Sequence, residues 1–187
     1  MGAIGRHDPV LLILAAFSRH DAALDWARET ASDRWGDIEL VSERFAFDQT
    51  SYYEESMGSG LSKQFFAFRP LVDPSGLVDW KHAAIAWEDE YRRQAGHSEP
   101  RPLNLDPGYL TQAKLVLAST KDRDHRLYLS RGIYAEGTLY YHAGAWTARP
   151  WTYPDYRQAE YHRFFDRCRE YLRRQLRAEG PETASHS

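Results

Sequence analysis

Residues 10–106 alternate between stretches typical of buried strands and stretches typical of amphipathic helices, and this order constrains the fold most strongly. Apolar runs and period-two patterns predict strands, whereas apolar residues three and four positions apart predict helices. The expected elements are a strand at 10–18, a helix from Asp21 to Gly36, strands at 37–47 and 61–71, a helix between Asp73-Pro74 and Gly96, and a short strand at 102–105. This β-α-β-β-α-β order is typical of a ferredoxin-like split βαβ core.

The rest of the chain predicts further antiparallel strands and a last helix. Asp106-Pro107-Gly108 has the composition of a tight turn, which is expected to end the short strand. Strand patterns at 112–120, 125–131 and 133–142 predict an antiparallel β-meander appended to the core. A C-terminal helix is expected to start at Asp155, which we interpret as a cap rather than a catalytic acid.

Length and composition favour one compact domain. The prediction is a single α+β domain over residues 1–178 and a disordered tail at 179–187, where apolar periodicity stops. The formal charge of −3 recommends neither nucleic acid nor an anionic membrane as a partner, and the apolar run 10–17 is too short to span a bilayer. The single cysteine, Cys168, excludes an intramolecular disulfide and favours a cytoplasmic location. Its place on the apolar stripe of the last helix predicts a core thiol.

Alternation along residues 133–142 predicts a polar sheet face. Tyr134 and Glu136 share one side of this strand, and pairing across tight turns is expected to add Tyr128, Arg126 and Lys114 to the same side. Two cations, one carboxylate and two phenols suit the binding of a phosphate or carboxylate group beside a proton-transfer residue. The alternative is the solvated face of an antiparallel sheet with ordinary cross-strand pairs.

A second group of polar residues surrounds the predicted turn. Asn104 and Asp106 are expected either to stabilise the turn or to present a carboxylate to a substrate or metal. Hard cations prefer several oxygen ligands, so Asp106 and Glu136, with Asp48 and Glu54, are the candidate Mg²⁺ ligands. Their spacing identifies no metal.

Other motifs are less specific. None of the eight histidines lies in a helical zinc motif such as H-E-x-x-H, so no structural zinc site is predicted. His125, next to Arg126 at the start of a strand, is the histidine of interest. The segment 48–60 is interpreted as a binding loop or lid, with an ordinary connection as the alternative. The adjoining GSGLSK lacks the spacing of a Walker phosphate-binding loop.

The last helix offers a different functional interpretation. It is rich in arginine, and such a helix either contacts RNA or a protein, or forms a solvated surface. The arginines are Arg157, Arg163, Arg167, Arg169, Arg173, Arg174 and Arg177.

Several blocks of sequence resemble a known family. They are FAFDQTSYYEESMG, LNLDPGYL, KLVLASTK with HRLYL, GIYAEGTLYY and PWTYPDYR. These blocks are similar to the signatures of domain-of-unknown-function family 4416, a family of bacterial and archaeal proteins, over about residues 9–176. The resemblance implies a cytoplasmic bacterial protein. It also implies that the matched polar residues form the family's shared surface: Asp48, Tyr53, Glu54, Asn104, Asp106, Lys114, Lys121, His125, Arg126, Glu136 and Asp155.

From these observations we expect a protein that binds, and that could also transform, an anionic small molecule such as a nucleotide or phosphorylated metabolite. The catalytic candidates are Glu136, Asp106 and His125. The ligand-binding candidates are Lys114, Arg126, Tyr128, Tyr134, Asn104, Lys121, Tyr53 and Glu54. Mg²⁺ is the candidate cofactor. The competing hypothesis is a non-catalytic module that binds RNA or a protein through the arginine-rich helix.

Overall fold

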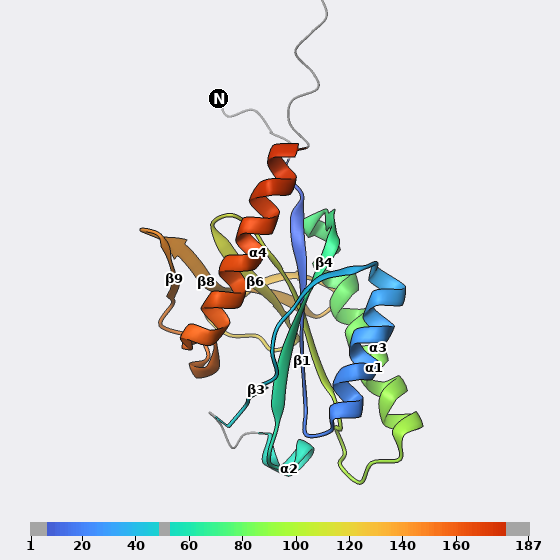
Figure 1. The fold of residues 1–187 in the computed structure, drawn as a ribbon. Coiled ribbons are helices and arrows are strands. Elements are labelled where there is room, and N and C mark those ends of the chain that lie inside the picture. The colour runs from blue at the N-terminus through green and yellow to red at the C-terminus, as the bar shows by residue number, and fades with distance from the viewer. Residues whose placement is uncertain (1–6, 49–52, 179–187) are drawn as a thin grey trace, which may run out of the picture.

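The computed structural model describes residues 7–48 and 53–178 and contains a nine-stranded antiparallel sheet (Figure 1). Its strands are β1 (Val10–Ser18), β2 (Ile38–Val41), β3 (Phe45–Ala46), β4 (Ser62–Val72), β5 (Asn104–Leu110), β6 (Lys114–Ser119), β7 (Leu127–Ser130), β8 (Ile133–His142) and β9 (Ala145–Ala148). The strand order is β2-β4-β1-β5-β6-β8-β7, with β3 beside β4 and β9 beside β8.

Helices cover both faces of this sheet (Figure 1). They are α1 (Asp21–Trp35), α2 (Glu54–Met57), α3 (Leu77–Ala95) and α4 (Ala159–Ala178), with 3₁₀ turns η1 (Pro74–Gly76) and η2 (Pro154–Arg157). Strand β1 is buried along its whole length because its side chains alternate between two cores. Leu12 and Leu14 pack with α1 and α3, whereas Leu11 and Ile13 pack with α4. The mixed α and β architecture predicted from the sequence is confirmed.

The ends of α3 follow the predicted signals. Asp73 accepts a hydrogen bond from the Ser75 amide at 2.8 Å, and Pro74 opens the 3₁₀ turn that leads into the helix. Gly96 ends the helix with a left-handed φ of 64°, a conformation that glycine adopts without strain. The helix therefore begins and ends close to the residues expected from its caps.

The strand predicted at 37–47 is divided into β2 and β3. Both pieces pair with β4, and Ser42 lies at the break between them. The Ser42 hydroxyl accepts a hydrogen bond from the Phe65 amide at 2.9 Å. A side chain thus takes the place of a backbone acceptor in the ladder, which interrupts the strand.

The predicted Asp106-Pro107-Gly108 turn is wrong. These residues lie inside β5, where Asp106 pairs with Ala15 and Pro107 with Leu14 of β1. Proline lacks an N–H, so it is tolerated in a strand only where no ladder bond is needed from it. Pairing with the central strand therefore overrides the turn chemistry of this tripeptide.

The predicted meander is also wrong. Strand β8 pairs with β6, and β7 lies outside β8 at the edge of the sheet. The ten-residue β8 contributes buried Ile133 and Leu139, whereas all four residues of β7 are exposed. The more apolar strand thus occupies the interior position. Strand β9, which pairs with the end of β8, was not predicted.

The predicted start of the last helix is wrong by one turn. Asp155 lies in η2, and α4 begins at Ala159. Asp155 does not cap α4, because its carboxylate pairs with Lys63 of β4. The tail predicted at 179–187 lies outside the described residues. Among those described, no helix combines the length and apolar character needed to cross a membrane.

Candidate functional site

A cavity of about 500 Å³ lies where β5 and β6 separate. Strand β6 pairs with β5 only over Gly108–Leu110, although β5 continues along β1 back to Asn104. Gly108 approaches β6 so closely that a Cβ there would lie 2.3 Å from the Val116 carbonyl oxygen. The preceding Pro107 has no N–H to extend the ladder. The proline and glycine therefore mark the point at which the strands part and the cavity begins.

Arg126 and Glu136 form a buried ion pair in the cavity wall. Arg126 Nε donates to Glu136 Oε2 at 2.7 Å, and only 4% and 2% of the two side chains are exposed. Nη1 of Arg126 also donates to Ser119 Oγ and to the Lys121 carbonyl, and its Nη2 donates to Tyr153 Oη. Burial alone lowers the pKa of Arg126, but the hydrogen bond and charge of Glu136 outweigh it and raise that pKa. Arg126 is therefore charged and largely committed to protein partners.

Lys81 reaches the cavity from α3, which packs on the sheet face opposite to α4. Its ammonium group donates to the Leu105 carbonyl and to Asp106 Oδ1, both at 2.9 Å. The second oxygen, Oδ2 of Asp106, accepts from Asn104 Nδ2 at 2.8 Å. Burial tends to raise the pKa of Asp106, but the nearby positive charges of Lys81 and Lys63 dominate and lower it. Asp106 is thus an ionised carboxylate, with 32% of its side chain exposed.

A third ion pair, Lys63–Asp155, also lines the cavity. Lys63 Nζ lies 2.5 Å from Asp155 Oδ2, with both side chains buried. The same ammonium lies 4.1 Å from the Phe47 ring centroid and 4.9 Å from those of Phe17 and Tyr156. An ammonium group over ring faces gains favourable electrostatic energy. These aromatic contacts and the ion pair hold Lys63 in a fixed position.

Two further arginines in the lining have hydrogen-bond donors left over. Arg101 Nη2 donates to Glu88 Oε2 at 3.0 Å, and in the described part of the chain its other guanidinium N–H groups have no partner. Arg123 is exposed, and no described residue accepts a hydrogen bond from its side chain. The complete lining has six Lys or Arg side chains against three carboxylates. The cavity therefore has an excess of positive charge, in a chain whose formal net charge is −3.

An aromatic wall lies beside these charges. The His125 and Trp151 rings are stacked, with centroids 5.2 Å apart and planes 12° apart. His125 Nε2 lies 3.2 Å from Glu136 Oε2, and the Trp151 indole donates to the Gly137 carbonyl at 3.1 Å. A rigid, flat surface of this kind suits the stacking of a planar ligand group.

Seven of the predicted site residues line the cavity. They are Tyr53, Asn104, Asp106, Lys121, His125, Arg126 and Glu136. Four others do not: Glu54, Lys114, Tyr128 and Tyr134. Glu54 is exposed at the start of α2, and Tyr128 packs edge-on against Tyr134.

Three of the four residues outside the cavity belong to strands whose register or position differs from the expected one. Our expected register paired Tyr128 with Glu136, but Tyr128 pairs with Tyr134. The two phenol rings therefore pack against each other and not against a ligand. Lys114 begins β6, whereas the cavity borders the Ser119 end of that strand, about 17 Å away at 3.4 Å per residue. Alternation places residues on a face of a sheet but gives no position along it.

The cavity also contains residues that the sequence did not identify as ligand-binding. The main ones are Lys63, Lys81, Arg101, Arg123 and Tyr153. Lys63 and Lys81 did leave a signal, because each interrupts an apolar pattern. Lys63 shares the inward parity of Phe65 on β4, and Lys81 lies on the buried stripe of α3 between Leu77 and Ala84. A lysine at a core position requires a partner for its charge.

Two of the four carboxylates predicted to bind Mg²⁺ are paired with cations in the cavity. Asp106 is paired with Lys81, and Glu136 with Arg126.

Cys168, predicted to be a core thiol, is buried in the α4 core, and burial raises its pKa far above the ordinary value. It is therefore not an activated nucleophile.

Comparison with known protein families gives a match over most of the chain. Residues 8–171 match the domain of unknown function DUF4416. The chain belongs to this family. The resemblance inferred from the sequence blocks is thus confirmed, and the cavity of this DUF4416 member lies wholly within the matched region. No curated protein and no solved structure gives a significant match.

Proposed function

We propose that the cavity between β5 and β6 binds a small anionic molecule with a planar group, such as a nucleotide or a phosphorylated metabolite. One observation carries this proposal: six cationic side chains face three carboxylates in a cavity of about 500 Å³. Ligand pockets in proteins have volumes of roughly 300–1,000 Å³. An excess of positive charge in a recessed site attracts anions and excludes cations.

The contacts divide the lining into binding and positioning residues. Arg101 and Arg123, which retain free donors, hold the anionic group in the proposed complex. Arg126 instead fixes Glu136, and Lys81 fixes Asp106. The planar part of the ligand stacks on Trp151 or His125. If the ligand is transformed, Asp106 is the best-placed carboxylate for acid–base chemistry, because part of it is exposed to the cavity. A Mg²⁺ ion would then arrive with the ligand's phosphate groups.

The fold is consistent with a ferredoxin-like core carrying this site. We infer that core from the neighbouring strands β2-β4-β1-β5 and from α1 and α3, which cover one face of them. The cavity lies at the border between this proposed core and the added strands β6 and β8.

A second candidate function rests on α4. The groove between the β8–β9 turn and this helix is lined by Arg169, Arg173, Arg174 and Arg177 against Asp166 and Glu170. Such a surface would contact RNA or an acidic protein. Other arginines of this region are already used: Arg157 donates to three backbone carbonyls, and Arg163 pairs with Glu160. This observation makes α4 the weaker candidate.

A thermal-shift screen against nucleotides and phosphorylated metabolites, with and without Mg²⁺, tests the proposal. A ligand at one hundred times its dissociation constant adds about 2.7 kcal/mol of stability. This corresponds to a rise in Tm of roughly 5–11 °C for a chain of this size. Arg101→Gln and Arg123→Gln should each reduce the shift, because each removes a guanidinium group with N–H donors available to an anion.

Lys114→Gln is the matched control, since it removes one charge outside the cavity. It should leave the shift unchanged. An equal loss in Lys114→Gln, or full shifts in both arginine variants, would show that the anion binds elsewhere. RNA binding that weakens steeply with salt, without any small-molecule shift, would support the α4 surface instead.

A further inference from the structure

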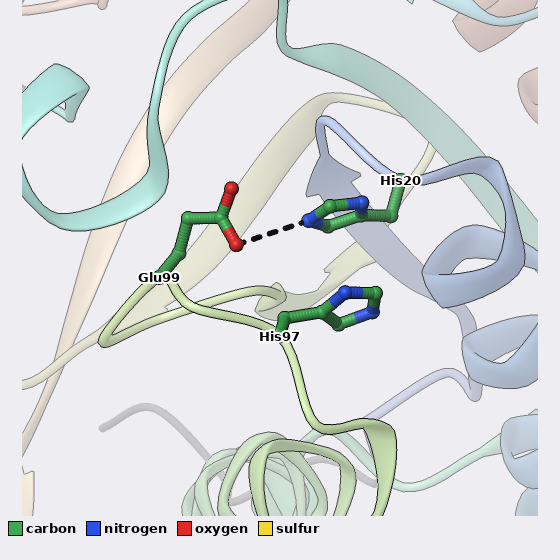
Figure 2. Close-up of side chains that lie close together, drawn as sticks. All are labelled: His20, His97 and Glu99. Atoms are coloured by element: carbon green, nitrogen blue, oxygen red, sulfur yellow. Dashed lines mark hydrogen bonds and ion pairs between the residues drawn. The ribbon is translucent and has the colours of Figure 1, made fainter.

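A cluster of two histidines and one glutamate lies outside the cavity (Figure 2). His20 and His97 are stacked, with ring centroids 3.7 Å apart, and the Glu99 carboxylate lies at the edge of the stack. His20 Nε2 is 3.3 Å from Glu99 Oε2. One ligand atom from each residue lies within 4.8 Å of the other two. Among the described residues, this is the only group of three potential metal ligands so close together.

Two separate parts of the chain form the cluster: the residue before α1 and the connection between α3 and β5. His20 directly precedes α1, while His97 follows Gly96 at the end of α3 and Glu99 lies in the connection to β5. The buried Ser18 hydroxyl joins these segments, since it accepts from the His20 amide at 3.0 Å and donates to the Pro102 carbonyl at 2.5 Å. The histidine and glutamate side chains therefore start from a constrained backbone.

We propose that His20, His97 and Glu99 form a binding site for a divalent transition metal ion, with Zn²⁺ as the best-fitting ion. Imidazole and carboxylate ligands suit zinc, and a site with three protein ligands leaves the fourth position for water or another ligand. Nothing in the spacing of the sequence indicates this site, because His20 and His97 are far apart in the chain.

The His20–Glu99 separation fits zinc coordination. Bonds of roughly 2.0–2.2 Å from zinc to nitrogen and oxygen place neighbouring tetrahedral ligands about 3.3–3.6 Å apart. The observed distance from His20 Nε2 to Glu99 Oε2 is 3.3 Å, so a zinc ion can replace the hydrogen bond without moving either atom far. His97 must rotate out of the ring stack to point a nitrogen at the same ion, a movement of roughly 1–2 Å for the ligand atom given these bond lengths.

The surrounding contacts resemble the outer shell of a metal site. His97 Nε2 lies 3.1 Å from Tyr91 Oη, and within the described residues its Nδ1 has no hydrogen-bond partner. Glu99 Oε1 accepts from Arg19 Nη1 at 3.0 Å, whereas Oε2 contacts His20 and, at 3.5 Å, the Ser98 hydroxyl. Ligating histidines and carboxylates in metalloproteins are held by such second partners.

Zinc binding can be measured by competition with a chromogenic chelator of micromolar affinity, on full-length protein stripped of metal. We expect one Zn²⁺ per chain at this site. His97→Asn and Glu99→Gln should each weaken binding at least tenfold, because each removes one of three ligands. His142→Asn, a change of an exposed histidine on β8, is the matched control and should bind as the native protein does. Circular dichroism of each variant checks that it is folded.

Substitution by Co²⁺ tests the geometry in the native protein, without any variant. A site with three protein ligands and one water should give the visible d–d absorption of four-coordinate Co²⁺. Failure to retain Zn²⁺ against the chelator, or equal binding by His97→Asn, Glu99→Gln and the native protein, would overturn the proposal. A spectrum of hexaaquo Co²⁺ alone would overturn it as well.

Discussion

The buried Arg126–Glu136 ion pair lines the cavity, but its main role is to stabilise the protein. Glu136 accepts from Arg126 and His125 through one oxygen, and its other oxygen accepts from Thr138 at 3.2 Å. A carboxylate with this many partners is satisfied inside the protein. Removal of the guanidinium would leave an uncompensated buried charge, which is far more costly than the net value of the pair.

Arg126→Met should therefore lower the free energy of unfolding by about 3–5 kcal/mol, the usual cost of removing one partner of a buried ion pair. The double variant Arg126→Met/Glu136→Leu should regain a large part of this loss, since no charge remains unpaired. Urea unfolding of the native protein and both variants measures the difference. If the double variant is at least as unstable as Arg126→Met, lost packing and not the unpaired charge of Glu136 causes the loss of stability.

The contact between Arg126 and Glu136 was only partly predictable from the sequence. Strand alternation placed Arg126 and Glu136 on one face, and both do line the cavity. The pairing register was wrong, however: Tyr128 pairs with Tyr134 instead of Glu136, and the β7–β8 ladder shifts between Tyr128 and Ser130. Lys63 and Lys81 reach the cavity through long-range strand order and helix placement, which single-sequence patterns do not encode. For the same reason, sequence patterns did not reveal the cluster of His20, His97 and Glu99.

Strand β5 shows how an element can override its own local sequence. Asp106-Pro107-Gly108 would form a turn in isolation, yet pairing with β1 holds it extended. The proline lies where the neighbouring β6 departs, and Gly108 lies where β6 comes closest. Local turn signals therefore failed here for a structural reason: Gly108 allows the close pairing of β5 with β6, and Pro107 marks the point where the two strands part.

Gly108→Ala should destabilise the protein by roughly 1–3 kcal/mol, the typical cost of overpacking. The added Cβ would lie 2.3 Å from the backbone oxygen of Val116, which cannot move without shifting β6. Gly137→Ala is the control on β8, which lies on the other side of β6. A Cβ there meets nothing within 4 Å, so this variant should change stability by no more than about 0.5 kcal/mol. Denaturant melts of both variants make the comparison, and equal stabilities would contradict this account of β5.

For the whole molecule, the distribution of charge separates the two proposed functions. The chain is acidic overall, but the cavity between β5 and β6 is cationic, so attraction of an anion is local rather than a property of the surface at large. A recessed charged site is less screened by salt than an exposed arginine surface such as that of α4. The cavity also contains Trp151, so a ligand bound there must alter the surroundings of that indole.

The most direct test is a ¹H–¹⁵N NMR titration that follows the indole N–H signals of the six tryptophans during addition of each anionic candidate ligand. Trp151→Phe identifies the Trp151 signal. We predict that a binding ligand shifts the Trp151 signal, whereas those of Trp26, Trp35 and Trp87, in the core on the other face of the sheet, stay in place. Saturable binding that leaves Trp151 unshifted, or a panel of nucleotides and phosphorylated metabolites that moves no signal at all, would contradict the proposed anion site.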